Sequence, residues 1–307
     1  MILAAGLTPA WQQILLFERF LPGEVNRASE VHWCASGKVL NVGLALHHLG
    51  VESRTLALVG GAAGDSIRAE FARLGVAADW VQTRTPTRIC TTLLDQTTGL
   101  TTELVENSRA VSAAELVEFQ SAFAALTPTA RAVVLTGSLP AGTPGDFYRR
   151  LIERVRAPVV LDARGPELLE SLSARPFLVK PNREELSRTL GMSLESDAEL
   201  VLGLRQLVER GAEWVVISQG SESVWLAGAT GLWRIWPPKV DVVNPIGSGD
   251  CLAAGIAAAL ARGLDPVAAA RFGVAAGAVN ALELLPARLQ TDRVDRLAKT
   301  IAVERVP

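Results

Sequence analysis

Unbroken apolar runs alternate with helix-period stretches along most of the chain after residue 36. Apolar runs without polar alternation are typical of strands buried on both faces, and intervening helices of ten or more residues provide crossover connections. The pattern therefore predicts an α/β fold with a mostly parallel sheet covered by helices on both faces. The predicted strands are residues 55–61, 131–137, 157–165, 177–182 and 213–220, and the predicted helices are residues 64–75, 144–156 and 198–212.

Two segments interrupt this alternation. Residues 10–33 and 87–106 alternate apolar and polar positions and contain the turn signals PGE and TTG. Each segment is too short to form a core of its own, so we predict a small antiparallel sheet that projects from the main domain as a lid. The tail over residues 264–301 is Ala-rich and predicted to be mostly helical. Residues 1–307 are predicted to form a single domain.

Composition excludes several classes of protein. The 307 residues have a net charge of -2, without the basic excess of a nucleic-acid-binding protein. The longest apolar run, near residues 251–261, is too short to cross a bilayer, and the N-terminus lacks a basic signal-peptide region. Three cysteines form no CxxC pair, which indicates free thiols and a cytoplasmic protein. A small anionic substrate remains compatible with these features, because a few Arg and Lys side chains can hold one phosphate.

The predicted strands end in glycine-rich and polar stretches, among them TGSLPAG, LDARG, KPNREE and SQGSES. Ligands of parallel α/β sheets bind at the carboxyl ends of the strands. We therefore expect the functional site at this edge of the sheet.

The stretch NPIGSGD (residues 244–250) runs directly into a predicted helix and has two interpretations. In the first, Ser248 or Asp250 caps the helix. In the second, the backbone amides of Gly247, Ser248 and Gly249 hold a phosphoryl group at the positive end of the helix dipole. Asp250 would then accept the proton of an attacking hydroxyl. The seven residues alone do not decide between these interpretations.

Six stretches that occur in a fixed order along the chain favour the second interpretation of NPIGSGD. They are GKVLN, VGGAAGDSIRAEFARLGV, GSLPAG, KPNREEL, SQG and NPIGSGD itself. Together they resemble the PfkB family of ribokinase-like carbohydrate kinases, and most closely its 1-phosphofructokinase and tagatose-6-phosphate kinase branch. The resemblance covers nearly the whole chain. It implies a three-layer α/β/α core with a β lid, and transfer of the ATP γ-phosphate to a sugar.

The resemblance implies roles for the residues of the phosphate-transfer side. Asp250 matches the catalytic base, and Gly247, Ser248 and Gly249 match the anion hole. Asn182 and Glu185 match the family's NxxE pattern, in which Glu185 helps to hold Mg²⁺ through water; a capped helix after Pro181 is the alternative. The remaining matches are Ser218 and Gly220 in the nucleotide-binding turn, and Asn280 beside the adenine, where an exposed helix asparagine is the alternative. The sequence leaves open whether a K⁺ ion assists near Asn244.

The resemblance also implies roles on the sugar side. Gly37 and Asn41 match the sugar-contacting motif GGKGxN, and Ser138 matches a residue near the acceptor. Arg27 and Arg88 match positions that hold the existing phosphate of the substrate. Lys38 could assist them, and Cys90 matches a position that lines the pocket.

Three positions depart from the family pattern on this side. Gln12 stands where an aspartate commonly grips sugar hydroxyls, Ser36 replaces the first glycine of GGKG, and Val39 replaces the last. A neutral amide at position 12 loses a charge-assisted hydrogen bond worth about 1.5–3 kcal/mol. These changes could alter the sugar preference, weaken activity or narrow the pocket.

The sequence therefore predicts an ATP- and Mg²⁺-dependent kinase for a ketohexose monophosphate, either fructose 1-phosphate or tagatose 6-phosphate. Two alternatives stay open: a kinase for an unphosphorylated sugar or nucleoside, and a non-catalytic sensor of sugar phosphate or nucleotide. No nucleic-acid or membrane partner is expected. An apolar face on the lid favours a homodimer.

Overall fold

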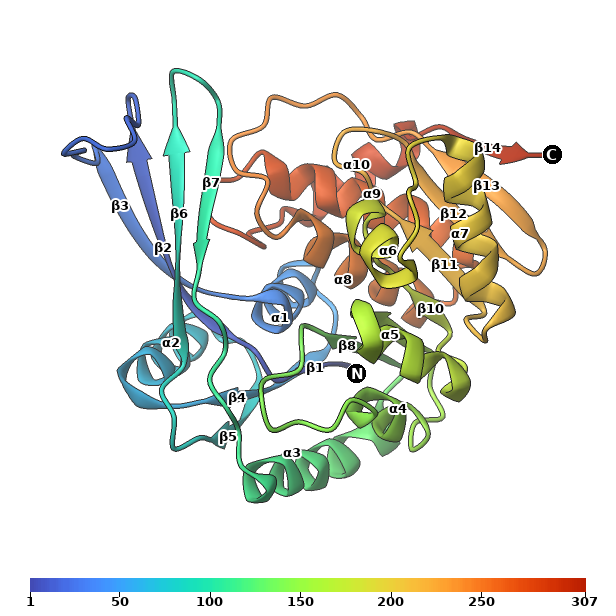
Figure 1. The fold of residues 1–307 in the computed structure, drawn as a ribbon, viewed down its shortest axis with the longest axis horizontal. Helices are drawn as coiled ribbons and strands as arrows, with labels where there is room; N and C mark the ends of the chain where they lie inside the picture. The colour runs from blue at the N-terminus through green and yellow to red at the C-terminus, as the bar shows by residue number, and fades with distance from the viewer.

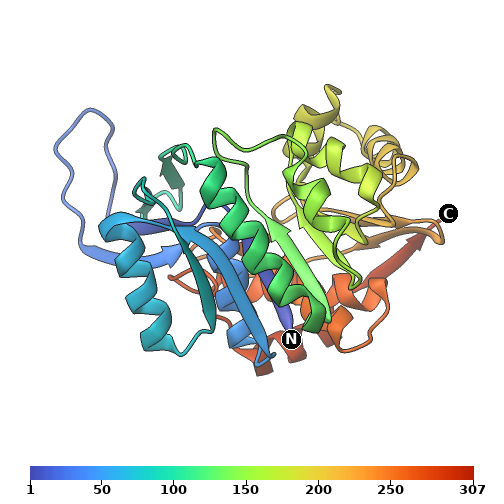
Figure 2. The ribbon, with the colours of Figure 1, turned by 90° about the horizontal axis from the view of Figure 1, so that it is seen from below.

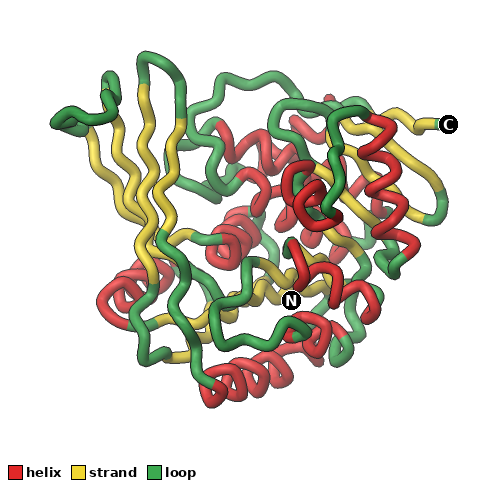
Figure 3. The backbone as a smooth tube through the Cα atoms, viewed as in Figure 1, coloured by secondary structure: helices red, strands yellow, loops and turns green.

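The computed structural model describes all 307 residues and contains a large and a small β-sheet (Figures 1 and 3). The strands of the large sheet are β1 (Ile2–Gly6), β4 (Ser53–Val59), β5 (Ala78–Gln82), β8 (Ala132–Thr136), β9 (Val159–Asp162), β10 (Leu178–Val179), β11 (Trp214–Ile217), β12 (Val224–Gly228), β13 (Gly231–Ile235) and β14 (Val303–Val306). Their order is β14-β13-β12-β11-β10-β9-β8-β1-β4-β5. Neighbours from β5 to β11 pair in parallel, and β11 to β14 pair antiparallel. The predicted mostly parallel sheet is confirmed.

Helices cover both faces of the large sheet (Figures 1 and 2). Alternate residues of β1 show the division, since Ile2 and Ala4 belong to one buried cluster whereas Leu3 and Ala5 belong to another. The α-helices are α1 (Lys38–His48), α2 (Gly61–Leu74), α3 (Ala113–Leu126), α4 (Phe147–Ile152), α5 (Gly165–Ser171), α6 (Arg183–Leu190), α7 (Asp197–Glu209), α8 (Ser248–Ala261), α9 (Pro266–Ala281) and α10 (Thr291–Thr300). Short 3₁₀ helices occupy Thr127–Thr129 and Leu172–Ala174. This arrangement is the three-layer α/β/α core that the resemblance implied.

The small sheet extends from one side of this core (Figure 1). Its strands are β2 (Ala10–Phe17), β3 (Glu30–Ser36), β6 (Arg88–Asp95) and β7 (Thr101–Val105), in the order β3-β2-β6-β7. Two antiparallel pairs, β2 with β3 and β6 with β7, are joined by a parallel pair between β2 and β6. The strands fall in the two segments whose alternation interrupted the α/β pattern, and β3 continues to Ser36.

The helix that begins within NPIGSGD packs tightly in the core. Helix α8 is buried along nearly its whole length and packs closely on α9. A Cβ atom added to Gly255 of α8 would lie 2.8 Å from the Cα of Gly273 in α9, so only glycine allows this approach. The close packing fixes the position of Asp250 in the first turn of α8.

Candidate active site

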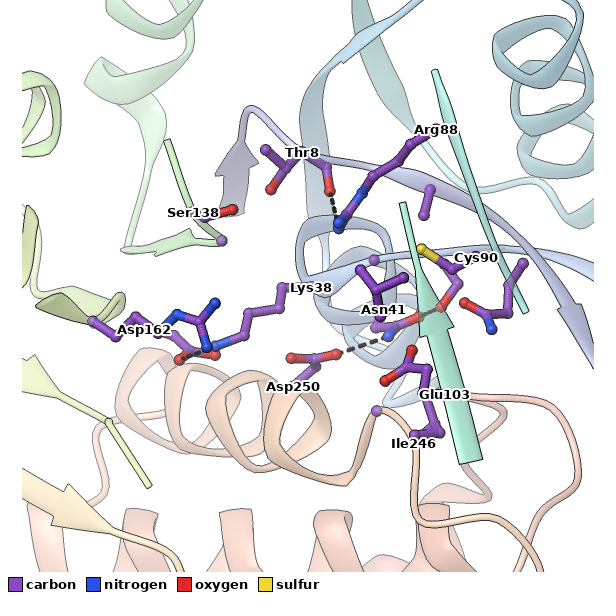
Figure 4. Close-up of a pocket in the computed structure, with 18 of the residues that line it drawn as sticks. Thr8, Lys38, Asn41, Arg88, Cys90, Glu103, Ser138, Asp162, Ile246 and Asp250 are labelled. Carbon is purple, nitrogen blue, oxygen red and sulfur yellow. Dashed lines mark hydrogen bonds and ion pairs between the residues drawn. The ribbon is translucent and has the colours of Figure 1, made fainter. Parts of the chain in front are cut away.

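A pocket of about 380 Å³ lies between the carboxyl ends of the parallel strands and the small sheet (Figure 4). Its lining brings together segments that are distant in the sequence, as expected for this edge of the sheet. Ten of the predicted site residues line it: Gln12, Gly37, Lys38, Asn41, Arg88, Cys90, Ser138, Glu185, Gly247 and Asp250. Residues of the pocket that the sequence analysis did not select include Glu103, Asp162 and Arg164.

Helix α8 begins at this pocket without a side-chain cap. Gly247 precedes the first turn with φ of +84°, and no side chain accepts a hydrogen bond from the first amides. The prediction that Ser248 or Asp250 caps the helix is therefore wrong, because both residues lie within its first turn and the cap position is Gly247, which has no side chain. The Ser248 amide donates to the Pro245 carbonyl at 3.2 Å, whereas the amides of Gly247 and Gly249 donate to no group of the chain. Free backbone amides at the positive end of a helix dipole are groups suited to binding an anion.

Asp250 is one of two buried aspartates that line the pocket. Its side chain is 7% exposed, and its Oδ2 accepts a hydrogen bond from Asn41 Nδ2 at 2.7 Å (Figure 4). Burial and the nearby Asp162 raise its pKa to about 7, against the opposing effects of Lys38, the Asn41 hydrogen bond and Lys180. A carboxylate with a pKa near neutrality is suited to accept a proton at physiological pH.

Asp162 forms the second carboxylate, at the carboxyl end of β9. It is fully buried, with Lys38 Nζ at 2.9 Å, Lys180 Nζ at 3.4 Å and the Thr136 hydroxyl at 3.3 Å. Burial alone would raise its pKa, but Lys180 and Lys38 hold the pKa below the ordinary value. Asp162 and Lys180 stand in the polar strand ends LDARG and KPNREE. Their place after buried strands is the signal that could have identified them.

Asn182 and Glu185 form a capping box at the start of α6. Asn182 Oδ1 accepts from the Glu185 amide at 2.7 Å, and Glu185 Oε2 accepts from the Asn182 amide at 3.0 Å. The alternative of a capped helix is thus confirmed for the Asn182 side chain. The other oxygen of Glu185 remains available, at 3.5 Å from Lys38 Nζ and 3.9 Å from Arg164. No group of three or more His, Cys, Asp or Glu side chains could hold a metal ion.

The other two predicted nucleotide residues follow β11. Ser218 accepts through its carbonyl from the Arg183 amide at 3.1 Å and bridges to Asn182, so this turn lies beside the start of α6. Gly220 adopts a φ of +61° and has no atom within 4 Å of the position of an added Cβ. The turn is therefore open on the side of Gly220.

Asn280 was expected either beside the adenine or exposed on the surface of its helix, and the structure places it in the core. It is completely buried, so the alternative of an exposed helix asparagine is wrong. Its Nδ2 donates to the Ile246 carbonyl at 2.9 Å and to Ser248 Oγ at 3.0 Å, and its Oδ1 accepts from the Ala287 amide at 2.7 Å. Its amide is used to hold the loop before α8, because the tight packing of α9 on α8 directs it inward. No polar atom is left for a nucleotide.

The small sheet provides the opposite side of the pocket, which we call the acceptor wall: Gln12, Arg88, Cys90 and Glu103. Gln12 is 2% exposed and donates through Nε2 to Thr92 Oγ1 at 2.7 Å. Cys90 is also buried, and burial raises the pKa of its thiol. Glu103 brings a carboxylate to this wall. The buried part of the wall is therefore uncharged.

Arg88 and Arg27, the two predicted phosphate ligands, are separated. The Arg88 guanidinium lines the pocket and donates to the backbone carbonyls of Thr8, Pro9 and Glu106 at 3.1, 3.3 and 3.1 Å. Arg27 lies exposed in the loop between β2 and β3 and does not line the pocket. The prediction that both arginines meet one phosphate does not hold within one chain, because the loop carries Arg27 away from the wall.

The fold and the pocket define a three-layer α/β protein in which a buried carboxylate lies in the first turn of a helix, at the edge of a mostly parallel sheet. The chain belongs to the pfkB family of carbohydrate kinases, whose family model matches residues 4–288. It is 30% identical to the tagatose-6-phosphate kinase of Staphylococcus epidermidis, over 100% of both chains.

Solved structures agree on the fold. A possible 1-phosphofructokinase from Thermotoga maritima superposes with a TM-score of 0.92 at 23% identity, over 100% of both chains. Phosphofructokinase-2 from Escherichia coli in complex with fructose-6-phosphate gives 0.87 at 24% identity, over 97% of this chain and 99% of that one. A ribokinase from Thermotoga maritima gives 0.78 at 20% identity, over 98% and 100%. The ribokinase-like fold is confirmed. None of the helices has the length and apolar character needed to span a membrane.

Proposed function

We propose that this protein is an ATP-dependent hexose-phosphate kinase that phosphorylates a ketohexose monophosphate, either fructose 1-phosphate or tagatose 6-phosphate. The observation that carries the proposal is the position of Asp250. Its buried carboxylate, with a pKa raised to about 7, lines the same pocket as Gly247 at the start of α8 and the acceptor wall. A base there can serve a sugar hydroxyl while an anion site beside it holds the transferred group.

In the proposed phosphoryl transfer, each of these residues has a separate role. The sugar hydroxyl oxygen forms a bond to the γ-phosphorus, the bond from that phosphorus to the β,γ-bridging oxygen breaks, and the hydroxyl proton passes to Asp250. The amides of Gly247 and Gly249 stabilise the charge on the transferred oxygens. Lys38 lies within 3.5 Å of Glu185 and adds positive charge to the same side of the pocket.

Nucleotide and metal are assigned to the side of the pocket formed by α6. When bound, ATP supplies the phosphoryl group and Mg²⁺ neutralises its charge. Ser218 and Gly220 would hold the nucleotide at the open turn after β11. Glu185 would hold Mg²⁺ through its available oxygen, because Mg²⁺ keeps several waters and needs few protein carboxylates.

A K⁺ ion would bind as a further cofactor near Asn244. The Asn244 amide donates to the Leu284 carbonyl at 2.8 Å, and its oxygen accepts from the Ile246 amide at 3.0 Å, so carbonyl oxygens of this loop would provide the ligands. Escherichia coli phosphofructokinase-2 has been solved in complex with potassium. Turnover in K⁺ salts compared with Na⁺ salts tests this part of the proposal.

A homodimer through the small sheet is also part of the proposal. One face of that sheet exposes apolar side chains, with Val31 at 51%, Trp33 at 43%, Ile89 at 37% and Leu104 at 55% exposure. An apolar sheet face of this kind favours pairing with another copy. Arg27 lies on a loop of the same sheet and would contact substrate only in such a pair. Sedimentation of the wild type and of Trp33→Glu tests it, with a monomeric wild type as the contrary result.

A second candidate, a kinase for an unphosphorylated sugar, is favoured by two observations. Glu103 adds a negative charge to the acceptor wall, and Arg27 does not reach it. Both would weaken a phosphate site.

An ATP-consumption screen separates the candidates. The screen compares fructose 1-phosphate, tagatose 6-phosphate and fructose 6-phosphate with fructose and tagatose. We expect kcat/KM to be at least about tenfold higher for a sugar phosphate, since charge-assisted contacts contribute about 1.5–3 kcal/mol. A preference for free sugars would establish the second candidate. No ATP consumption with any of these sugars would contradict both kinases and favour a sensor.

A further inference from the structure

Ser36 lies at the end of β3, where it is buried, lines the pocket and contacts Asn41. Its hydroxyl, in a side chain only 1% exposed, donates to Asn41 Oδ1 at 3.1 Å. Asn41, which is 2% exposed, donates in turn through Nδ2 to Asp250 Oδ2 at 2.7 Å (Figure 4). Two consecutive hydrogen bonds therefore connect the small sheet to Asp250.

The direction of these hydrogen bonds is determined by the chemistry of the three groups. An ionised carboxylate only accepts, so Asp250 requires the NH₂ group of Asn41. The amide oxygen of Asn41 then faces Ser36, and only the hydroxyl can supply a proton to it. A rotation of the Asn41 amide by half a turn would place its oxygen against the carboxylate. Ser36 prevents this rotation by donating to the oxygen.

Asp250 depends on this contact for its orientation. Asn41 supplies the one hydrogen bond that the Asp250 carboxylate accepts from a side chain. The charged groups that face Asp250 act without hydrogen bonds to it: Asp162 at the end of β9, Lys38 at the start of α1 and Lys180 after β10. Glu185 of α6 faces Lys38, and Glu103 of β7 faces the pocket from the small sheet.

We propose that Ser36 is a positioning residue for phosphoryl transfer, holding Asp250 through Asn41 so that its carboxylate is presented to the acceptor hydroxyl. This inference rests on the proposed function, in which Asp250 receives the proton. Position 36 is one of the departures from the glycine-rich pattern that the chain resembles. The hydroxyl at this position is therefore a feature of this chain, and it acts on the transfer chemistry from the side of the sugar.

The kinetic test compares Ser36→Ala, Ser36→Thr and the wild type. Loss of one hydrogen bond should lower kcat about 3- to 10-fold while KM for the sugar stays within about twofold. The acidic limb of the pH–rate profile should move to higher pH, because the Asn41 hydrogen bond lowers the pKa of Asp250. Ser36→Thr keeps the hydroxyl and should restore both values.

Ser171→Ala is the matched control, because Ser171 is also fully buried and donates to the Glu167 carbonyl at 2.7 Å, away from the pocket. It should leave the pH profile unchanged. A merely structural role for Ser36 would lower the melting temperature without moving the acidic limb. Wild-type kcat and an unmoved limb in Ser36→Ala would overturn the proposal.

A second measurement needs no turnover. Carbon-13 NMR titration of the Asp250 carboxyl, assigned by its absence in Asp250→Asn, reports its pKa in the protein without ATP or sugar. The pKa should be higher in Ser36→Ala than in the wild type and unchanged in Ser171→Ala. An identical pKa in Ser36→Ala overturns the role of Ser36. If no sugar is phosphorylated by the wild type, the proposed function fails, whereas this titration still decides the role of Ser36.

Discussion

The two sides of the pocket are built from different kinds of groups. The side that we assign to phosphoryl transfer, called the transfer side, holds the nearly completely buried charged residues Asp162, Lys180 and Asp250. Lys180 compensates Asp162 at 3.4 Å, and Asp162 raises the pKa of Asp250. On the acceptor wall, the buried residues Gln12 and Cys90 are uncharged. A change of Asp162 or Lys180 would leave the other charge uncompensated, whereas a neutral polar residue can be exchanged at smaller cost. The chemistry of transfer is therefore constrained more strongly than the choice of sugar.

The two sides of the pocket also differ in the amount of buried apolar packing that supports them. The transfer side lies at the ends of strands between buried apolar clusters of 44 and 32 residues. The small sheet is anchored by a separate cluster of four buried residues, Ile14, Leu16, Cys34 and Leu94. Loss of a contact on the wall should therefore affect substrate binding, and loss of a contact at α8 should affect the chemical step.

The largest expected effect is on the transfer side. Asp250→Asn should lower kcat about 10²- to 10⁴-fold, because the side chain can no longer accept the proton. Binding of ATP, measured by calorimetry, should persist. Asp292→Asn, which removes an exposed acidic residue from the first turn of α10, is the matched control and should keep full activity. Turnover of Asp250→Asn near that of the control would remove Asp250 from the mechanism.

Arg88 tests the acceptor wall. Arg88→Ala should raise KM for the sugar phosphate about 10- to 100-fold through the loss of charge-assisted hydrogen bonds, and should change KM for the free sugar little. Arg84→Ala, at an exposed position of the preceding loop, is the control. Equal losses for both sugars would show that Arg88 serves only to hold the Thr8, Pro9 and Glu106 carbonyls.

Asp250 should also reduce the stability of the protein at neutral pH. Its folded-state pKa of about 7 exceeds its ordinary value of 3.8, so its contribution to folding is fully present below 3.8 and is lost as pH rises through 7. Asp250→Asn should therefore raise the melting temperature at pH 8 by about 2–6 °C, corresponding to about 1–3 kcal/mol. The gain should shrink at pH 5. A variant less stable than the wild type at pH 8 would be the opposite result.

Gln12 should give the smallest effect. Gln12→Ala removes one neutral contact and should raise KM for the sugar about 2- to 10-fold with little change in kcat. Thr92→Val removes the partner of the Gln12 amide and should give a similar but weaker change. A fall in kcat at constant KM would place Gln12 on the transfer side and contradict the division between the two sides.

Much of the fold could be predicted from the sequence because buried parallel strands leave a clear apolar pattern. The predicted strand at 131–137 is β8, and the predicted helix at 64–75 is α2. The antiparallel hairpin of β12 and β13 was not predicted, since its apolar residues follow a strand directly and no crossover helix marks them. The mostly helical tail over residues 264–301 was predicted, but the strand after it, β14, depends on pairing with β13.

The site was predictable where a residue stands in a local motif, as for Gly247 and Asp250. It was not predictable where the outcome depends on partners distant in the sequence. Asn280 is buried by the packing of α9 on α8 and is separated by more than thirty residues from the Ile246 carbonyl that it contacts. The prediction that Arg27 joins Arg88 at the phosphate was wrong for a single chain, because a position in a loop does not specify where the side chain points. The contact of Ser36 with Asn41 required the bend between β3 and α1.

The pH dependence of kcat/KM tests the central claim most directly, because it reports the ionisation of the free enzyme and substrate. With Asp250 as the proton acceptor, the profile should fall on the acidic side with a midpoint near 7, the pKa of its buried carboxyl. The phosphate of the substrate titrates near 6, so the two groups can be distinguished. A profile that stays flat to pH 6 and falls only with the substrate phosphate would contradict the assignment of Asp250.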